Sequence, residues 1–202
     1  MKKYTKLILP ALLLTLSGCA MNSANAYNGN VSYKNVQDVE KTTLNFGATD
    51  LNLIVEKMVT SLLRTPILDG KKRPVIMLSH VKNKTSEHID TKNITDKIKT
   101  TLLKSGRVRV TSYNEIGKDL QDELEYQSSK YVKKDTAKKI GNQIAADYKI
   151  YGEITSIEKN DGRNVDLYYK MTLNLVDIET GLTEWADEKE IRKSGSKSLF
   201  SN

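Results

Sequence analysis

The two histidines are the first candidates for catalytic or metal-binding chemistry. His80 falls at the expected end of a strand and His88 in the loop that follows. A zinc site takes three or four protein ligands, so two histidines do not make one. Ser86, Glu87 and His88 have the residue types of a catalytic triad. Adjacent residues of one loop rarely reach triad geometry, however, and no nucleophile elbow frames a serine. We therefore predict no metal site and no catalytic residues.

Signatures of other chemistries are also missing. Neither G-x-x-x-x-G-K-[ST] nor G-x-G-x-x-G occurs, so no phosphate-binding loop is expected. The tightest basic cluster is residues 71–73, which we interpret as a solvated loop, whereas nucleic-acid binders show larger basic patches or a known module. The sequence predicts a protein that is not an enzyme, with no cofactor, no small-molecule substrate and no nucleic-acid partner.

Cys19 is the residue with the clearest chemistry. Lys2, Lys3 and Lys6 precede an apolar run over 7–16, and Leu-Ser-Gly comes directly before Cys19, the only cysteine. This order is typical of a secretory signal peptide, and the run is too short for a membrane span of about 20 residues. The placement of Cys19 resembles a bacterial lipobox, in which the thiol is lipidated and the chain is cut before it. An ordinary signal peptide with an incidental cysteine is the alternative.

The residue after Cys19 indicates which of the two membranes would hold a lipid anchor. It is Ala20 rather than the Asp that usually retains lipoproteins of enteric bacteria at the inner membrane. We therefore expect a lipid anchor in the outer membrane, with the protein facing the periplasm. Several buried acyl chains, at about 0.8 kcal/mol per CH₂, hold a protein firmly. With Cys19 acylated, no thiol remains for a disulfide.

Composition divides the chain into four parts: a signal peptide over 1–18, the lipidated cysteine and a tether over 19–46, a globular domain over 47–193 and a polar tail over 194–202. Removing 1–18 takes away three of the 32 Lys and Arg and none of the 25 Asp and Glu, which leaves a charge of +4. Six of the 27 residues over 20–46 are Asn. Such a segment buries too little apolar surface to order itself, although residues 31–39 could alternatively add a strand.

Apolar periodicity predicts the first elements of the domain. One helical stripe, with Thr49 or Asp50 as the expected N-cap, is formed by Leu51, Ile54, Val55, Met58, Val59 and Leu62. Residues 74–78 predict a strand that is buried on both faces, and a polar loop follows over 81–90. A second helix is expected to bury Ile94, Ile98 and Leu102 and to end at Gly106, and residues 108–111 alternate as a strand.

The second half of the domain is expected to be mostly strand. Residues 116, 120 and 124 suggest a short helix, and Asp135 is the expected cap of another whose inner face is Ala137, Ile140, Gly141, Ile144 and Ala145. Strands are predicted over 147–154, 165–176 and 185–191, joined by turns at 160–162 and 179–181. Two βα crossovers followed by two hairpins predict a single α/β domain with a mixed sheet and helices packed on it.

Strand alternation predicts which sheet face is free. Odd-numbered apolar residues of 165–176 point one way and Asp166, Tyr168 and Lys170 the other. In the preceding strand Tyr151 falls on the polar side. Exposed aromatic residues are enriched in protein-binding surfaces, so Tyr151 and Tyr168 are candidates for a contact. The alternative is that a helix or the tether covers them.

The order of the motifs resembles the LpoB family of lipoproteins that activate bifunctional penicillin-binding proteins. The resemblance covers the lipobox and about residues 46–185. It is carried by FG at 46–47, MVTSL at 58–62, VIML at 75–78, VKNKT at 81–85, LLKSG at 102–106, VTS at 110–112, KIG at 139–141, ADYKIY at 146–151 and VDIETG at 176–181. It implies a domain like the N-terminal domain of TolB.

The resemblance also implies a function. The domain would bind a class A penicillin-binding protein as a monomer and stimulate peptidoglycan synthesis, by binding an active conformation of the synthase better. Tyr151 and the loop residues Asn83, Lys84 and Thr85 match family positions and are the expected contacts. The tether is shorter than in enteric members and contains no proline. A curli-type secretion or flagellar outer-membrane lipoprotein with the same core is the alternative, although no pore-forming insertion is found.

Overall fold

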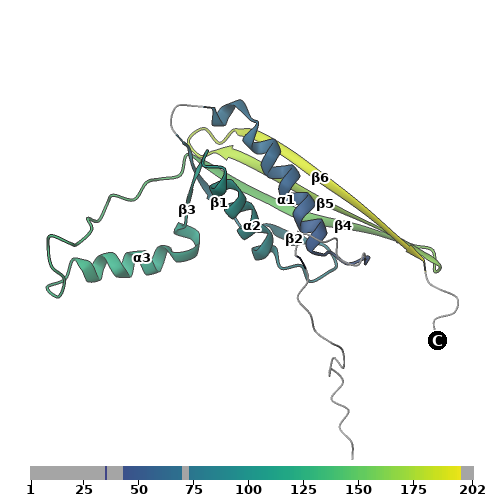
Figure 1. Ribbon diagram of the computed structural model, residues 1–202, viewed down its shortest axis with the longest axis horizontal. Helices are drawn as coiled ribbons and strands as arrows, with labels where there is room; N and C mark the ends of the chain where they lie inside the picture. Colours follow the sequence, from purple (N-terminus) through teal and green to yellow (C-terminus); the bar gives the residue numbers. More distant parts are fainter. Residues whose placement is uncertain (1–34, 36–42, 70–72, 197–202) are drawn as a thin grey trace, which may run out of the picture. The chain divides into compact units, whose positions relative to one another are not determined.

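The computed structural model describes Asn35 and residues 43–69 and 73–196 (Figure 1). The expected signal peptide, the lipidation site at Cys19 and most of the expected tether lie outside the described residues. Chain contacts separate residues up to Asp38 from those after it, and the helices and strands of the described residues all belong to the second unit. Its helices are α1 Ala48–Leu63, α2 Thr91–Lys104 and α3 Tyr113–Gln127, with a 3₁₀ turn, η1, at Pro66–Leu68.

The strands form one mixed sheet, as predicted. They are β1 Val75–Leu78, β2 Lys82–Lys84, β3 Arg109–Thr111, β4 Tyr148–Asn160, β5 Asn164–Asp177 and β6 Thr183–Ser196. The order is β3-β1-β4-β5-β6, and β2 also pairs with β4. The pairs of β1 with β3 and β4 are parallel, whereas β4, β5 and β6 are antiparallel. The class is therefore α/β, and β6 continues three residues past the expected end of the domain.

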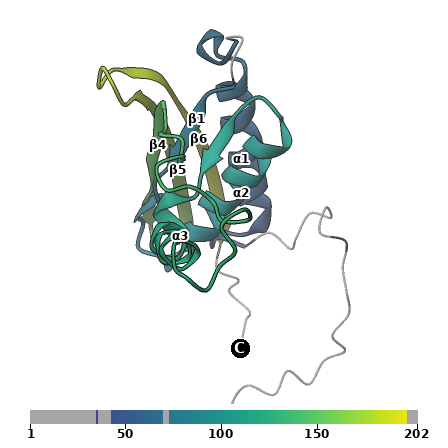
Figure 2. The same cartoon turned by 90° about the vertical axis from the view of Figure 1, so that its left-hand side faces the viewer.

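Helices α1 and α2 lie side by side over one face of the sheet (Figures 1 and 2). The apolar stripe predicted for α1 is buried in full, and Ile94, Ile98 and Leu102 of α2 are at most 1% exposed. Gly106 has φ of +69° directly after the C-cap of α2 and ends that helix as predicted. These stripes meet the sheet, so burial of apolar surface fixes both helices in place.

The predicted N-cap of α1 is wrong by a few residues. Gly47 occupies the cap position, and Asp50 lies inside the first turn. The Oδ2 atom of Asp50 accepts the N–H of Gly47 at 2.9 Å. A carboxylate one turn into a helix satisfies a free backbone donor as well as a cap residue does, and its charge is favourable there. Asp50 therefore stabilises the helix start without being the cap.

The loop predicted over 81–90 is partly wrong, because it contains β2. This short strand continues along the same side of β4 that β1 occupies, and the pairing register changes by one residue between the two. Val81, in the break, is buried, and its N–H donates to Oγ1 of Thr95 at 3.3 Å. All three residues of β2 are polar and exposed, so no apolar alternation marks them. The neighbouring strand imposes the extended conformation.

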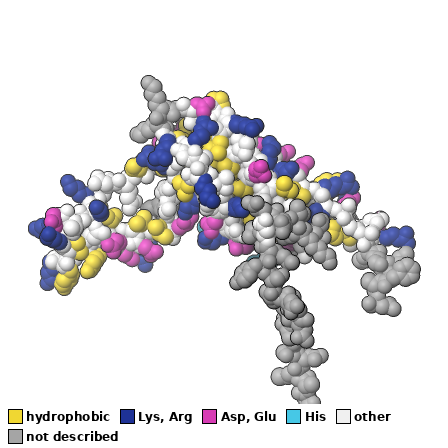
Figure 3. Space-filling model, viewed as in Figure 1, with side chains coloured by type: hydrophobic (Ala, Val, Ile, Leu, Met, Phe, Trp, Pro, Cys, Tyr) yellow, Lys and Arg dark blue, Asp and Glu magenta, His cyan; other side chains and the backbone are white. Residues whose placement is uncertain are grey.

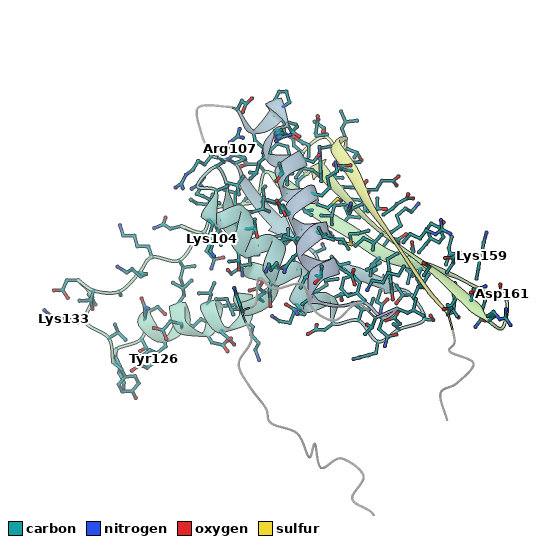
Figure 4. The ribbon with its side chains drawn as sticks, turned by 45° about the vertical axis from the view of Figure 1, so that its right-hand side comes forward. Lys104, Arg107, Tyr126, Lys133, Lys159 and Asp161 are labelled. Carbon is teal, nitrogen blue, oxygen red and sulfur yellow. The ribbon has the colours of Figure 1, made fainter. Side chains whose placement is uncertain are left out.

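The helix predicted over 135–145 is wrong. The chain there is irregular, and Gly141 has φ of +87°, a left-handed conformation that interrupts a helix. Ile140 and Ile144, expected on the buried side, are more than 60% exposed. The preceding helix is confirmed as α3, yet its apolar residues Ile116 and Leu120 are also well exposed. Tyr126 and Lys133 mark the far end of this region in Figure 4.

Candidate protein-binding surface

The face of β4, β5 and β6 opposite α1 and α2 is the candidate site, and we call it the outer face. Every second residue of β5 is buried under the helices, as predicted: Leu167, Tyr169, Met171, Leu173 and Leu175. The residues between them point to the other side. Register places them in rows across the three strands. One row joins Tyr151, Asn174 and Ala186, and the next joins Glu153, Thr172 and Glu188.

Tyr151 is the most prominent aromatic residue of the outer face. It is 42% exposed and is paired across the sheet with Asn174, whose own neighbour on β6 is Ala186. Because both of these side chains are short, the phenol ring of Tyr151 projects further from the sheet than its two neighbours. The backbone beneath it is rigid, because Gly152 and Ile154 are buried against the core. A rigid sheet that presents one uncovered tyrosine is suited to insertion into a pocket of a protein partner.

Tyr168 lies on the same face but in a separate environment. It is paired with Ile157, six residues along β4 from Tyr151, which separates the two tyrosines by about 20 Å. The guanidinium of Arg192 lies 5.2 Å from the ring centroid of Tyr168. Asp166 accepts a hydrogen bond from Arg192 at 2.8 Å and raises the pKa of that guanidinium. The structure therefore does not gather the two tyrosines into one aromatic cluster.

The three predicted loop residues divide between two roles. Register places Lys84 beside Thr155, on the outer face. Asn83 instead accepts hydrogen bonds from the N–H and the hydroxyl of Thr85 and donates to the carbonyl of Glu87 at 2.8 Å. The polar groups of Asn83 and Thr85 thus shape the turn after β2. Lys84 extends the outer face beyond β4 with a positive charge, whereas the other two hold its supporting loop.

Glu87 has a structural role that its sequence neighbours Ser86 and His88 do not reveal. Its carboxylate accepts the hydroxyl of Tyr169 and, at 3.0 Å, the N–H of Phe46. The rings of Phe46 and Tyr169 meet edge to face at 5.6 Å. Burial, followed by the hydrogen bond and the charge of Glu87, raises the pKa of Tyr169, so its hydroxyl stays protonated and donates.

The same cluster holds the residues that precede α1. The same hydroxyl, with its single proton, also lies 3.1 Å from the carbonyl oxygen of Leu44, and Lys193 donates to the carbonyl of Asn45 at 2.6 Å. Lys193 forms an ion pair with the buried Asp50. We call this set of contacts the clamp. Residues 44–46, predicted as tether, are therefore packed on the domain. Only the long sequence separation of the partners hid the clamp from sequence reasoning.

The described residues contain no cluster suited to metal binding. Across 43–69 and 73–196, no three His, Cys, Asp or Glu side chains converge on a point that could hold a metal ion. His80 and His88 are both exposed. None of the helices in that part of the chain has the length and hydropathy needed to span a bilayer. What remains is a surface of exposed charged, polar and aromatic side chains on a rigid sheet.

The fold is a small α/β domain with a mixed sheet that α1 and α2 cover on one face. The family described as peptidoglycan-synthase activator LpoB matches residues 50–191, which is well over half of the chain. The chain therefore belongs to the LpoB family, a family of peptidoglycan-synthase activators. No curated protein sequence matches the chain.

Solved structures of similar fold include members of this family. The LpoB C-terminal domain from Salmonella enterica is 16% identical, with a TM-score of 0.46, over 71% of this chain and 99% of that one. The NMR structure of Escherichia coli LpoB is 12% identical, with a TM-score of 0.42, over 94% and 91%. Lipoprotein GNA1162 from Neisseria meningitidis is 14% identical, with a TM-score of 0.37, over 63% and 88%.

Proposed function

We propose that the domain binds a bifunctional, class A penicillin-binding protein through the outer face and raises its rate of peptidoglycan synthesis. The observation that carries the proposal is the family match over 50–191. The outer face supports it, because Tyr151 and Lys84 stand exposed on a rigid sheet while the opposite face is occupied by helices. The chain acts as a monomer and as a ligand of the synthase, and it catalyses nothing itself.

Activation requires that the domain bind one conformation of the synthase better than another. A ligand with equal affinity for two states shifts neither, however tightly it binds. A tenfold preference for the active state corresponds to about 1.4 kcal/mol, which the contacts of one or two interface residues supply. The rigid sheet suits this role, since a surface that does not reorganise on binding can discriminate between two shapes of its partner.

The decisive experiment mixes the exported chain, carrying Cys19→Ala, with the class A synthases of the same cell. We expect one synthase to bind and to polymerise lipid-linked precursor faster when the chain is present, measured by consumption of a fluorescent precursor. Serum albumin at the same concentration is the control for non-specific stabilisation. If no class A synthase of the cell binds the chain, and none polymerises precursor faster in its presence, the proposed function is wrong.

We further propose that Cys19 anchors the protein to the outer membrane, with the domain in the periplasm. Cys19→Ala should move the protein from the outer-membrane fraction to the soluble periplasmic fraction, because no acyl chain remains to be buried. Circular dichroism should show the same folded domain, since its core is built from residues after 43. A variant that still sediments with outer membranes after a salt wash would refute the anchor.

A further inference from the structure

Strand β6 is one of the two end strands of the sheet. The strand pairs with β5 on one side, and no described strand pairs with its other side. It contains 14 residues, so it offers a row of unpaired backbone donors and acceptors. An extended peptide can add to such an edge by main-chain hydrogen bonds. Although β6 contributes side chains to the outer face, β5 separates its free edge from the strand that carries Tyr151.

A groove of about 460 Å³ lies between α1 and β6. Leu53 contributes an apolar side chain that is 46% exposed, and Lys57 is held in place by an ion pair with Asp187 at 3.0 Å. The hydrogen bond from the indole of Trp185 to Ser61 fixes the helix against the strand. In the view of Figure 3, hydrophobic and basic side chains are mixed over the helices. The groove therefore has an apolar contact and stable walls.

Charges on the two sides of β6 differ. The charged residues that line the groove are Arg64, Lys189, Lys57 and Glu56. Lys57 is paired with Asp187, and the remaining two cations outnumber the one carboxylate, so the lining is net positive. On the other side of the strand, Glu188 and Glu190 are exposed. A strand added to this edge would place alternate side chains over the groove and over the outer side. Acidic or apolar residues of the added strand fit over the groove, and basic residues fit on the outer side, near Glu188 and Glu190.

We propose that the β6 edge and the α1–β6 groove form a docking site for an extended segment of a partner protein, in which acidic or apolar residues alternate with lysine or arginine. Backbone pairing supplies the affinity, and Leu53, Arg64 and the β6 carboxylates select the sequence. The charges of β6 also discourage uncharged strands from adding to the edge. The site does not depend on which synthase binds the outer face.

The test uses a peptide of about nine residues, the length of a natural strand, in which lysine alternates with valine and glutamate. It is titrated into the ¹⁵N-labelled exported chain carrying Cys19→Ala. We expect saturable shifts of amide signals over 183–196 and in α1, with slower hydrogen exchange of β6. Leu53→Lys and Arg64→Glu should each weaken binding by about fivefold or more. A peptide of the same composition with its lysines grouped at one end should bind much more weakly.

Leu103→Lys is the matched control, because Leu103 lies on α2 with the same exposed fraction of 46%. It should leave binding unchanged. An equal loss in Leu103→Lys, shifts confined to β2 and β4, or no saturable shift would overturn the proposal. Two other occupants of the edge would also overturn it. Self-association at this edge would show as concentration-dependent sedimentation. Occupation by the chain's own N-terminal segment would show as exposure of the β6 amides when residues 20–42 are deleted.

Discussion

Gly152→Ala is expected to unfold the domain or to lower its melting temperature by roughly 10 °C. A β-carbon at this position would lie 2.6 Å from Cδ2 of Leu173 and still closer to the carbonyl oxygen of Thr172. The carbonyl belongs to the backbone of β5 and moves only if the β4–β5 pairing is distorted. Overpacking of this kind costs about 3 kcal/mol or more. Thermal unfolding followed by circular dichroism measures the change.

Gly195→Ala provides the matched control in β6. Its β-carbon would meet only the side chain of Leu44, at 3.4 Å or more, so its melting temperature should stay near that of the wild type. If both variants melted near the wild-type temperature, β4 and β5 would not approach each other at Gly152 as described. Loss of stability in both would mean that any added β-carbon in this sheet is harmful.

Tyr151→Ala is expected to weaken synthase binding by about tenfold, because truncating a central interface aromatic residue costs about 1–2 kcal/mol. The side chain is 42% exposed and contributes little to the core, so the melting temperature should change by less than about 2 °C. Affinity is measured by biolayer interferometry with the immobilised synthase, and stimulation by the precursor-consumption assay. Both should fall together if the contact drives activation.

Tyr126→Ala is the control for Tyr151→Ala. Tyr126 lies on α3, away from the outer face, and is 56% exposed, so it removes a similar ring from a different surface. Its affinity should equal that of the wild type. Normal binding by Tyr151→Ala would place the contact elsewhere on the domain while leaving the activator function intact. Equal losses in both variants would mean that the measured binding is not confined to the outer face.

Apolar periodicity predicted the helices and strands that bury one apolar side in the core. Helices α1 and α2 and strands β1, β4 and β5 have patterns that only one orientation on the core satisfies, so sequence and structure agree there. The exposed side of β4 and β5 was predicted for the same reason. Alternation therefore placed Tyr151 on the polar side of its strand. It did not decide whether a helix or the tether covers that side, because alternation relates a residue only to its neighbours in the strand.

Elsewhere, the structure depends on partners that are distant in the chain. Strand β2 has no apolar pattern, and its conformation follows from pairing with β4, about 70 residues later. Over 135–145 a helical period is present, but Ile140 and Ile144 stay more than 60% exposed, and Gly141 takes a left-handed conformation instead. Glu87 meets Tyr169 across 82 residues. Local pattern contains no information about such contacts.

The clamp also determines how the fold carries a mechanical load. A pull exerted on the chain before α1 would enter at Leu44 and Asn45, whose carbonyls are held by side chains of β5 and β6, and at Phe46, which Glu87 holds. The load is thus divided among three separate parts of the domain before it reaches α1. Without these bonds, the same pull would act first on Gly47 and would peel the helix one turn at a time. The domain could therefore be pulled through the residues that precede α1 while the sheet that carries Tyr151 keeps its shape.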